Sequence, residues 1–479
     1  MPHIASRVSG SGQGNGARGW QRSLATVLAA GLLLAAHAGA QKQSPPVGGT
    51  PKNFQLPSKR TFALPNGMGV TLIPYGEVPK VTVELMVMSG NVNEGPQEVW
   101  LADLSGDLMQ EGTTSQTAEA VAQTAARMGG SLNFSVTSDQ TDVGGDVLGE
   151  FAPDMVRLIA DVVRNPRLPA SELDRIKANR LRQLSIAKSQ PQALAQEKFS
   201  AVMFPNHAYG RLYPTEAMVQ SYTVEQIRGF YAANFGAARA HLYVAGKFDA
   251  TAVEAAVRSS FADWKAGTPA VANLATPKSG RAVYLIDRPK AVQSTIYLGL
   301  PIADPSSRDW EAIRVTNALL GGSFGSRITS NIRENKGYTY SPFSQLTSFP
   351  KSAYWVQQAD VTTNVTGASL KEIFYEIGKL RTEAVPAAEL KGIQNYLAGI
   401  FVLQNSTRQG IIDQLQFVRL HGLTEEFLTR RVANVYAVTP ADVQRIMQTY
   451  IDPAKMPIVV VGDENVIREQ IRPYQTVTP

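Results

Sequence analysis

The segment TVEQIRGFYAANFGAARAHLYVAG, residues 223–246, has a counterpart in TPADVQRIMQTYIDPAKMPIVVVG, residues 439–462. Both copies begin with threonine, continue with apolar residues at helical spacing and end in an apolar strand closed by glycine. Five positions correspond at a constant offset of 216 residues: Thr223 and Thr439, Ile227 and Val443, Phe230 and Ile446, Phe235 and Ile451, Gly246 and Gly462. Agreement in register over several positions predicts that the chain consists of two homologous halves.

The order of elements within each half indicates the fold class. Alternating strands come first, then helices, then further strands, and the strand-like segments 83–87 and 296–300 lie at a similar offset. This order predicts an α+β fold of two homologous domains, each an antiparallel-rich sheet covered by helices on one face. Residues 171–189 have the composition and spacing of one of the packing helices.

Composition shifts along the chain predict its divisions. Arg18 and Arg22 precede a short apolar run, residues 24–36, and small residues follow at 38–40, which is typical of a secretory signal peptide. An uncleaved anchor is the alternative. We therefore expect a signal peptide at 1–40, a flexible lead at 41–59, an N-terminal domain at 60–265, a linker at 266–280 and a C-terminal domain at 281–475.

Charge and cysteine content exclude several classes of protein. The chain has no cysteine, so it has neither disulfides nor a lipid anchor on cysteine. The net charge is +6 and the basic residues are scattered among acidic ones, which argues against nucleic-acid binding. After the signal, no apolar run approaches the roughly 18 residues of a membrane span. We expect an exported, periplasmic protein with no membrane span after signal cleavage.

Motifs along almost the whole mature chain resemble one family. Residues 64–74, 89–95 and 128–141, followed by 164–177, 204–218, 287–301, 319–328 and 332–344, are similar in order to pitrilysin/insulinase-like zinc metallopeptidases. The similarity is greatest to the branch of the mitochondrial processing peptidase. The resemblance covers about residues 60 to 475 and implies the two-domain α+β fold expected above.

The resemblance also implies a metal site, but this chain lacks its motif. Active members carry H-x-x-E-H on a helix, where two histidines bind zinc and the glutamate activates water. Aligned on the end of WLADLSGDLMQEGT, residues 100–113, the histidine positions hold Asp103 and Asp107, and the glutamate position holds Gly106. The third ligand falls at Gln183. We expect no zinc in this chain and no peptide cleavage by it alone; a harder metal at Asp103 and Asp107 is an alternative.

Two other features of the family pattern remain. Arg333 and Tyr340 lie in IRENKGYTY. The resemblance implies that such a pair reaches the substrate at the zinc site. Arginine can stabilise an oxyanion there, and tyrosine can donate a further hydrogen bond. Residues 129–141 resemble the edge strand that accepts an extended substrate, with Gly130, Ser131 and Asn133 as candidate contacts. A surface ion pair with a half-buried tyrosine, and an ordinary sheet strand, are the respective alternatives.

These features together suggest a noncatalytic subunit. We expect the chain to bind extended peptides in a periplasmic zinc endopeptidase, paired with a zinc-bearing paralogue that covers the sheet face left open by each half. The alternative is a non-enzymatic peptide-binding or scaffold protein that forms a homodimer. An enzyme with a non-zinc metal at Asp103 and Asp107 is a third hypothesis.

Overall fold

The computed structural model describes residues 54–475. The predicted signal peptide at 1–40 and most of the predicted lead at 41–59 lie outside these residues. The boundaries proposed for the two domains and the linker stay predictions. Within the described part of the chain, no helix has the length and apolar character that crossing a membrane requires.

The first half contains a six-stranded sheet in the order β1-β2-β6-β3-β5-β4. Only the β2–β6 pair is parallel. Its strands are β1 (Arg60–Ala63), β2 (Gly69–Pro74), β3 (Lys80–Val87), β4 (Asn133–Val136), β5 (Thr141–Leu148) and β6 (Ala240–Gly246). Its helices are α2 (Leu101–Met109), α3 (Ala118–Arg127), α4 (Ala152–Arg164), α5 (Ala170–Ser189), α6 (Pro191–Met203), α7 (Glu216–Ser221), α8 (Val224–Asn234) and α9 (Ala250–Phe261).

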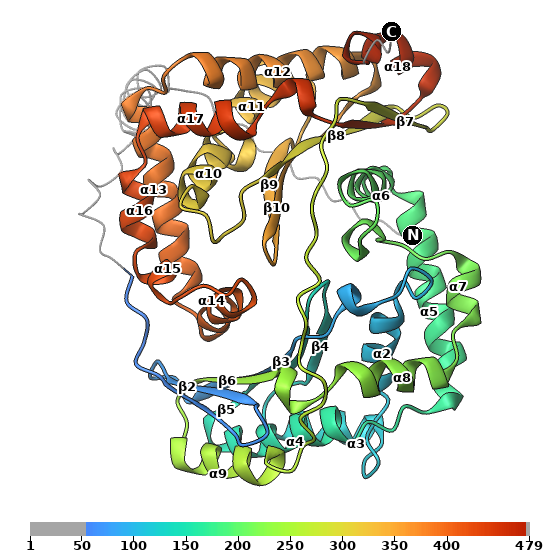
Figure 1. The fold of residues 1–479 in the computed structure, drawn as a ribbon, viewed down its shortest axis with the longest axis vertical. Coiled ribbons are helices and arrows are strands. Elements are labelled where there is room, and N and C mark those ends of the chain that lie inside the picture. The colour runs from blue at the N-terminus through green and yellow to red at the C-terminus, as the bar shows by residue number, and fades with distance from the viewer. Residues whose placement is uncertain (1–53, 476–479) are drawn as a thin grey trace, which may run out of the picture. The chain divides into compact units, whose positions relative to one another are not determined.

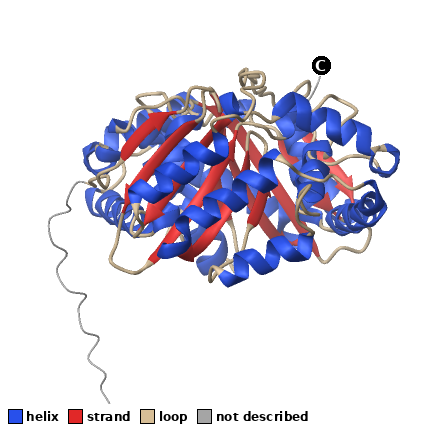
Figure 2. Ribbon diagram, turned by 90° about the horizontal axis from the view of Figure 1, so that it is seen from below, coloured by secondary structure: helices blue, strands red, loops and turns tan. Residues whose placement is uncertain are grey.

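The second half repeats this order as β7-β11-β8-β10-β9, again with one parallel pair, β7–β11. Its strands are β7 (Val283–Asp287), β8 (Gln293–Ile302), β9 (Phe343–Phe349), β10 (Ser352–Thr362) and β11 (Ile458–Gly462). Its helices are α10 (Trp310–Asn317), α11 (Arg327–Thr329), α12 (Thr366–Thr382), α13 (Ala387–Gln404), α14 (Arg408–Leu420), α15 (Glu426–Thr429), α16 (Arg431–Ala437), α17 (Pro440–Tyr450) and α18 (Glu464–Ile471). The predicted α+β fold with two sheets and covering helices is confirmed (Figure 2).

The repeated segment explains why the two halves fold alike. Thr223 begins α8 and Thr439 begins α17, each as the N-cap of a capping box that closes with the residue three positions later. Such a cap satisfies two amide groups that the first helical turn leaves free. Gly246 and Gly462 end the equivalent central strands β6 and β11.

Helices of the same half cover one face of each sheet, and a helix of the other half covers part of the opposite face. In the second half, Tyr297, Tyr354 and Val459 pack against Phe199 and Met203 of α6. In the first half, Met86 and Tyr243 belong to a cluster with the α14 residues Ile411, Ile412, Leu415 and Val418. Figure 1 shows α6 beside β7 and β8, and α14 beside β3.

In this exchange, α6 and α14 cover part of the second face of each sheet, in addition to the helices predicted on the first face. The two helices reduce the area of sheet that a second chain could cover. Phe199 and Met203 of α6, and Ile411, Ile412, Leu415 and Val418 of α14, are buried in the apolar clusters that reach the other half. Burying such side chains contributes about 1.5–3 kcal/mol each. A single chain therefore shields part of both surfaces by itself.

Phe199→Ala tests the exchange. The side chain is 1% exposed and its loss leaves a cavity under the second sheet, which costs about 3–5 kcal/mol of stability. We expect faster amide hydrogen exchange in β8 and β11, although the substitution lies in the first half. Phe261→Ala in α9, within the core of the first half, is the matched control. It should instead speed amide hydrogen exchange in the first sheet. Faster hydrogen exchange in the first sheet alone on Phe199→Ala would contradict the packing of α6 on the second sheet.

Candidate functional site

The predicted metal positions lie where α2 meets α5. Helix α2 carries Asp103, Gly106 and Asp107, and α5 carries Gln183. Their surroundings contain residues that the sequence analysis did not identify. The first is Arg180, which precedes Gln183 by three residues and so lies on the same side of α5.

Arg180 binds both aspartates. Its Nε donates to Asp107 Oδ2 at 2.6 Å and its Nη2 to Asp107 Oδ1 at 2.8 Å. Its Nη1 donates to Asp103 Oδ1 at 3.1 Å and, more distantly, to Gln183 Oε1 at 3.4 Å. One guanidinium therefore contacts the three positions where the family places zinc ligands, in the bidentate geometry that arginine forms with carboxylates.

The other groups at this locus are also engaged. Asn91 donates to Asp103 Oδ2 at 2.7 Å and to Glu94 Oε1 at 3.0 Å, and Glu94 accepts the backbone amide of Ala102 in the first turn of α2 at 2.8 Å. Burial raises the pKa of Glu94 to about 8. Burial also raises the pKa of Asp103, against the attraction of Arg180. Most of the donor and acceptor capacity at this locus is thus used within the chain.

Gly106 stands where active relatives would hold the catalytic glutamate. A Cβ built at Gly106 would lie 2.6 Å from Cγ2 of Val136 in β4, closer than carbon atoms approach without displacement. The absence of a side chain at 106 thus allows the edge strand to pack on α2. Glycine offers no group that could accept a proton.

These contacts test whether the residues present fit a zinc ion, and they do not. Zinc requires nitrogen, sulfur or carboxylate ligands about 2.0–2.3 Å from the ion, and the carboxylates here already bind a guanidinium. Among residues 54–475, no group of three or more histidine, cysteine or acidic side chains is arranged to hold a metal. The non-zinc alternative at Asp103 and Asp107 meets the same obstacle.

The structure brings Arg333 and Tyr340 together. The Arg333 guanidinium carbon lies 5.0 Å from the ring centre of Tyr340 and 4.4 Å from that of Phe324. Tyr340 is 80% exposed and Phe324 is 72% exposed, so two exposed rings contact one cation. Arg333 lies in a π-helical turn, Ser330–Asn335, a conformation often found at functional sites. Phe324 was not identified from the sequence.

The predicted substrate strand lies at an edge of the first sheet. Strand β4 pairs with β5 on one side, Asn133 opposite Gly144, and it is the last strand in the order of the sheet. Gly130 precedes it, where a Cβ would lie 1.8 Å from the carbonyl oxygen of Asp146. Gly130 therefore permits a close approach of two backbones, and Ser131 and Asn133 follow it toward the edge. Peptide binding by these residues stays a prediction.

A groove of about 330 Å³ lies beside β4 and is lined by residues of both halves. Asn133, Phe134 and Ser135 line one side, and α14 contributes Gln409, Asp413 and Gln416. Glu84 and Asp142 accept hydrogen bonds from the Gln416 amide at 2.9 and 3.1 Å. The acidic side chains Glu84, Asp142 and Asp413 give the groove a negative wall.

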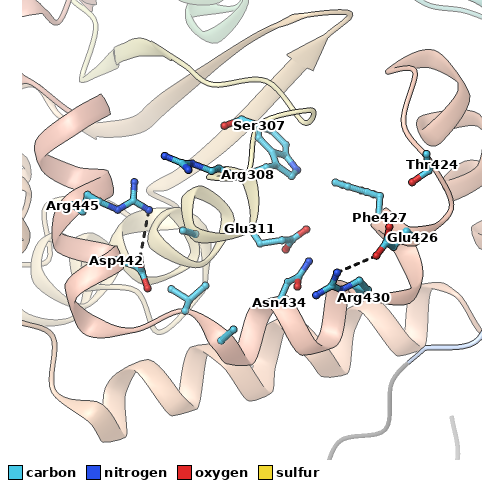
Figure 3. A pocket seen from close by; sticks show the side chains of 14 residues that line it. Ser307, Arg308, Glu311, Thr424, Glu426, Phe427, Arg430, Asn434, Asp442 and Arg445 are labelled. Atoms are coloured by element: carbon cyan, nitrogen blue, oxygen red, sulfur yellow. Dashed lines mark hydrogen bonds and ion pairs between the residues drawn. The ribbon is translucent and has the colours of Figure 1, made fainter.

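A second cavity, of about 500 Å³, lies among α10, α15, α16 and α17 (Figure 3). Its arginines are mostly paired locally: Arg430 with Glu426 at 3.0 Å, and Arg445 with Asp309 at 3.0 Å. None of the residues predicted from the sequence to act on substrate lines it. We regard the α2–α5 locus, the arginine–aromatic stack and the β4 groove as the candidate site.

The groove leads to a prediction about pH. Burial, reinforced by the charge of Glu84, raises the pKa of Asp142 to about 7, above the value of about 3.9 in an unfolded chain. Between these pH values the folded state binds more protons than the unfolded state, so stability falls as pH rises toward 7. Asp142→Asn should flatten this decline in urea denaturation measured from pH 4 to pH 8.

Glu77→Gln is the matched control, since the Glu77 side chain is 99% exposed, and it should leave the pH profile unchanged. An Asp142→Asn profile that runs parallel to that of the natural chain would contradict the prediction.

Comparisons with known proteins show the family to which the chain is similar. Residues 71–214 match the family described as Insulinase (Peptidase family M16), and residues 221–397 match the Peptidase M16 inactive domain. The chain is 27% identical, over 361 residues, to an uncharacterized zinc protease of Mycobacterium tuberculosis, covering 74% of this chain and 79% of that protein. It is 23% identical, over 396 residues, to an uncharacterized zinc protease of Streptomyces coelicolor, covering 81% and 86%.

Solved structures show the same fold. A peptidase M16 inactive domain from Pseudomonas fluorescens superposes with a TM-score of 0.77 at 22% identity, covering 85% of this chain and 98% of that one. A protease from Helicobacter pylori gives a TM-score of 0.79 at 17% identity, covering 85% and 100%.

Proposed function

Because the chain belongs to the M16 (insulinase) peptidase family, we propose that it is a noncatalytic, substrate-binding subunit of a zinc endopeptidase, paired with a zinc-bearing paralogue. The observation that carries this proposal is the exposed stack of Phe324, Arg333 and Tyr340. Such a stack holds a cation and a phenol at the surface in a chain whose own metal positions are filled by Arg180. We place the complex in the periplasm on the basis of the predicted signal peptide.

In this proposal the two subunits contribute different groups to one active site. The partner supplies the zinc and the water, while this chain supplies donors for the peptide: the Arg333 guanidinium and the Tyr340 hydroxyl. Donors aimed at developing negative charge contribute most in a site that excludes water. Strand β4 would hold an extended peptide by backbone hydrogen bonds, with little dependence on its sequence.

The acidic groove beside β4 adds a preference to this binding mode. Glu84, Asp142 and Asp413 lie along the groove, and within residues 54–475 no arginine or lysine is hydrogen-bonded to them. A peptide with a basic side chain near the strand would offset this charge. We therefore expect basic peptides to bind more tightly than acidic peptides of the same length, and less so at high salt.

A second candidate function is a non-enzymatic peptide-binding or scaffold protein that forms a homodimer. The exchange of α6 and α14 favours a role without a zinc-bearing paralogue, because the chain covers parts of both sheets by itself. In that case the groove and β4 would bind peptides, and the arginine–aromatic stack would only stabilise its own turn.

Sedimentation of the mature protein tests the pairing. Mixed with a homologue from the same organism that has an intact H-x-x-E-H motif, the chain should sediment as a heterodimer in analytical ultracentrifugation. Independent sedimentation of the two proteins at micromolar concentrations would count against the proposal. A homodimer of this chain that forms without binding the homologue would favour the second candidate.

Substitutions in the stack separate a catalytic role from a structural one. In the complex, Arg333→Ala or Tyr340→Phe should lower kcat/KM about 10²-fold, since removing one such donor costs roughly 3 kcal/mol in the transition state. Phe324→Ala removes one of the rings packed on Arg333 and should cost about fivefold, in line with a cation–π contact of about 1 kcal/mol. Heterodimer formation and the zinc content of the partner should not change.

Lys336→Ala is the matched control for charge, because Lys336 follows Arg333 in the same segment and lies 3.5 Å from Glu372. It should leave turnover unaltered. Full activity in all three stack variants would show that the stack is structural.

A further inference from the structure

We propose that the guanidinium of Arg180 occupies the position that zinc has in active relatives. This chain should therefore bind zinc only if the metal ligands are restored and Arg180 is removed as well. The proposal concerns what keeps metal out of this chain, and it holds whether or not the chain pairs with an active homologue. It rests on the contacts at the junction of α2 and α5.

The first argument is the position of the charge. Arg180 contacts Asp107 twice, Asp103 once and Gln183 once, and its Nη2 also reaches the Asp103 carbonyl at 3.3 Å. These three residues occupy the family's ligand positions. A cation that contacts all three of them stands where the ion would stand.

The second argument is burial. The side chains of Arg180 and Asp103 are 16% and 17% exposed, and that of Asp107 is 30% exposed. An arginine guanidinium stays charged at any physiological pH. A permanent positive charge in a poorly solvated site repels a dication strongly. Arginine and a metal ion are therefore alternatives at this locus.

The third argument is the fit of Arg180 to its surroundings. Its guanidinium carbon lies 5.8 Å from the ring centre of Trp100, whose Nε1 donates to the Leu212 carbonyl at 3.0 Å. Trp100 also packs edge-on against Tyr213 at 5.9 Å. The arginine is thus held by packing as well as by charge, and restoring histidines nearby would not by itself displace it.

Val136 separately obstructs a glutamate at position 106, because a Cβ built there would lie 2.6 Å from Val136 Cγ2. A test of the metal must therefore make room for the glutamate independently of Arg180. We define the restored set as Asp103→His, Gly106→Glu, Asp107→His and Gln183→Glu, with Val136→Ala to accommodate Glu at 106.

The experiment measures zinc retained after dialysis against metal-free buffer, with folding checked by circular dichroism. The restored set with Arg180 intact should retain less than about 0.1 zinc per chain, and the restored set with Arg180→Ala should retain about one. Arg175→Ala is the matched control on the same helix. Arg175 pairs with Glu111 and Glu172 at the surface, and its removal should leave the restored set without zinc.

Equal, stoichiometric zinc in the restored set with and without Arg180 would overturn the proposal. So would a restored set that folds with Arg180→Ala and still retains no zinc.

A single substitution provides a test that does not depend on the restored set folding. Arg180→Ala in the natural chain leaves Asp103 and Asp107 without their cation and should lower the Tm. Mn²⁺, which accepts carboxylate oxygens, should raise the Tm of this variant and not that of the natural chain, whereas choline chloride of equal ionic strength should raise neither. The absence of a Mn²⁺-specific increase in Arg180→Ala would contradict the proposal.

Discussion

The packing of α6 against the sheet of the other half governs the geometry of the candidate site. Helix α6 follows α5 after a single residue, Gln190, which ends one helix and begins the other. With Phe199 buried against Tyr297 and Tyr354, α6 anchors the end of α5, the helix that carries Arg180 and Gln183. In the opposite direction, α14 covers β3 and β6 and supplies one wall of the groove beside β4. The duplicated architecture thus positions both parts of the candidate site.

At the locus between α2 and α5, one guanidinium joins the two helices through Asp103, Asp107 and Gln183. An ion that bridges two helices contributes to their packing, and its removal would leave charged or polar groups buried without partners. Here the two acidic side chains and one arginine satisfy each other through several hydrogen bonds. Breaking such a buried pair by deleting one partner is costly, about 3–5 kcal/mol. In the proposal above, the guanidinium takes the place of a metal and retains the junction between α2 and α5.

The sequence was sufficient for the fold class and for the absence of the zinc motif. The register between residues 223–246 and 439–462 predicted the two halves because capping threonines and strand-ending glycines are local signals. Arg333 and Tyr340 were named as a pair from the family resemblance, and they are only seven residues apart in the sequence.

Other features depend on tertiary contacts that periodicity does not encode. The contacts of α6 and α14 join residues more than 90 positions apart, as Phe199 and Tyr297 illustrate. The contact between Gly106 and Val136 depends on how β4 lies across α2. Arg180 could have been suspected as the cation nearest to Gln183 on one helix face, but its pairing with Asp103 and Asp107 required the angle between two helices.

The most direct test of this account is cleavage of an unfolded peptide by the purified mature chain, incubated with zinc and without any homologue. The account predicts no cleavage above the buffer blank, because the metal position is filled by Arg180 and position 106 has no base. Cleavage that co-purifies with the chain and disappears on chelation would contradict it.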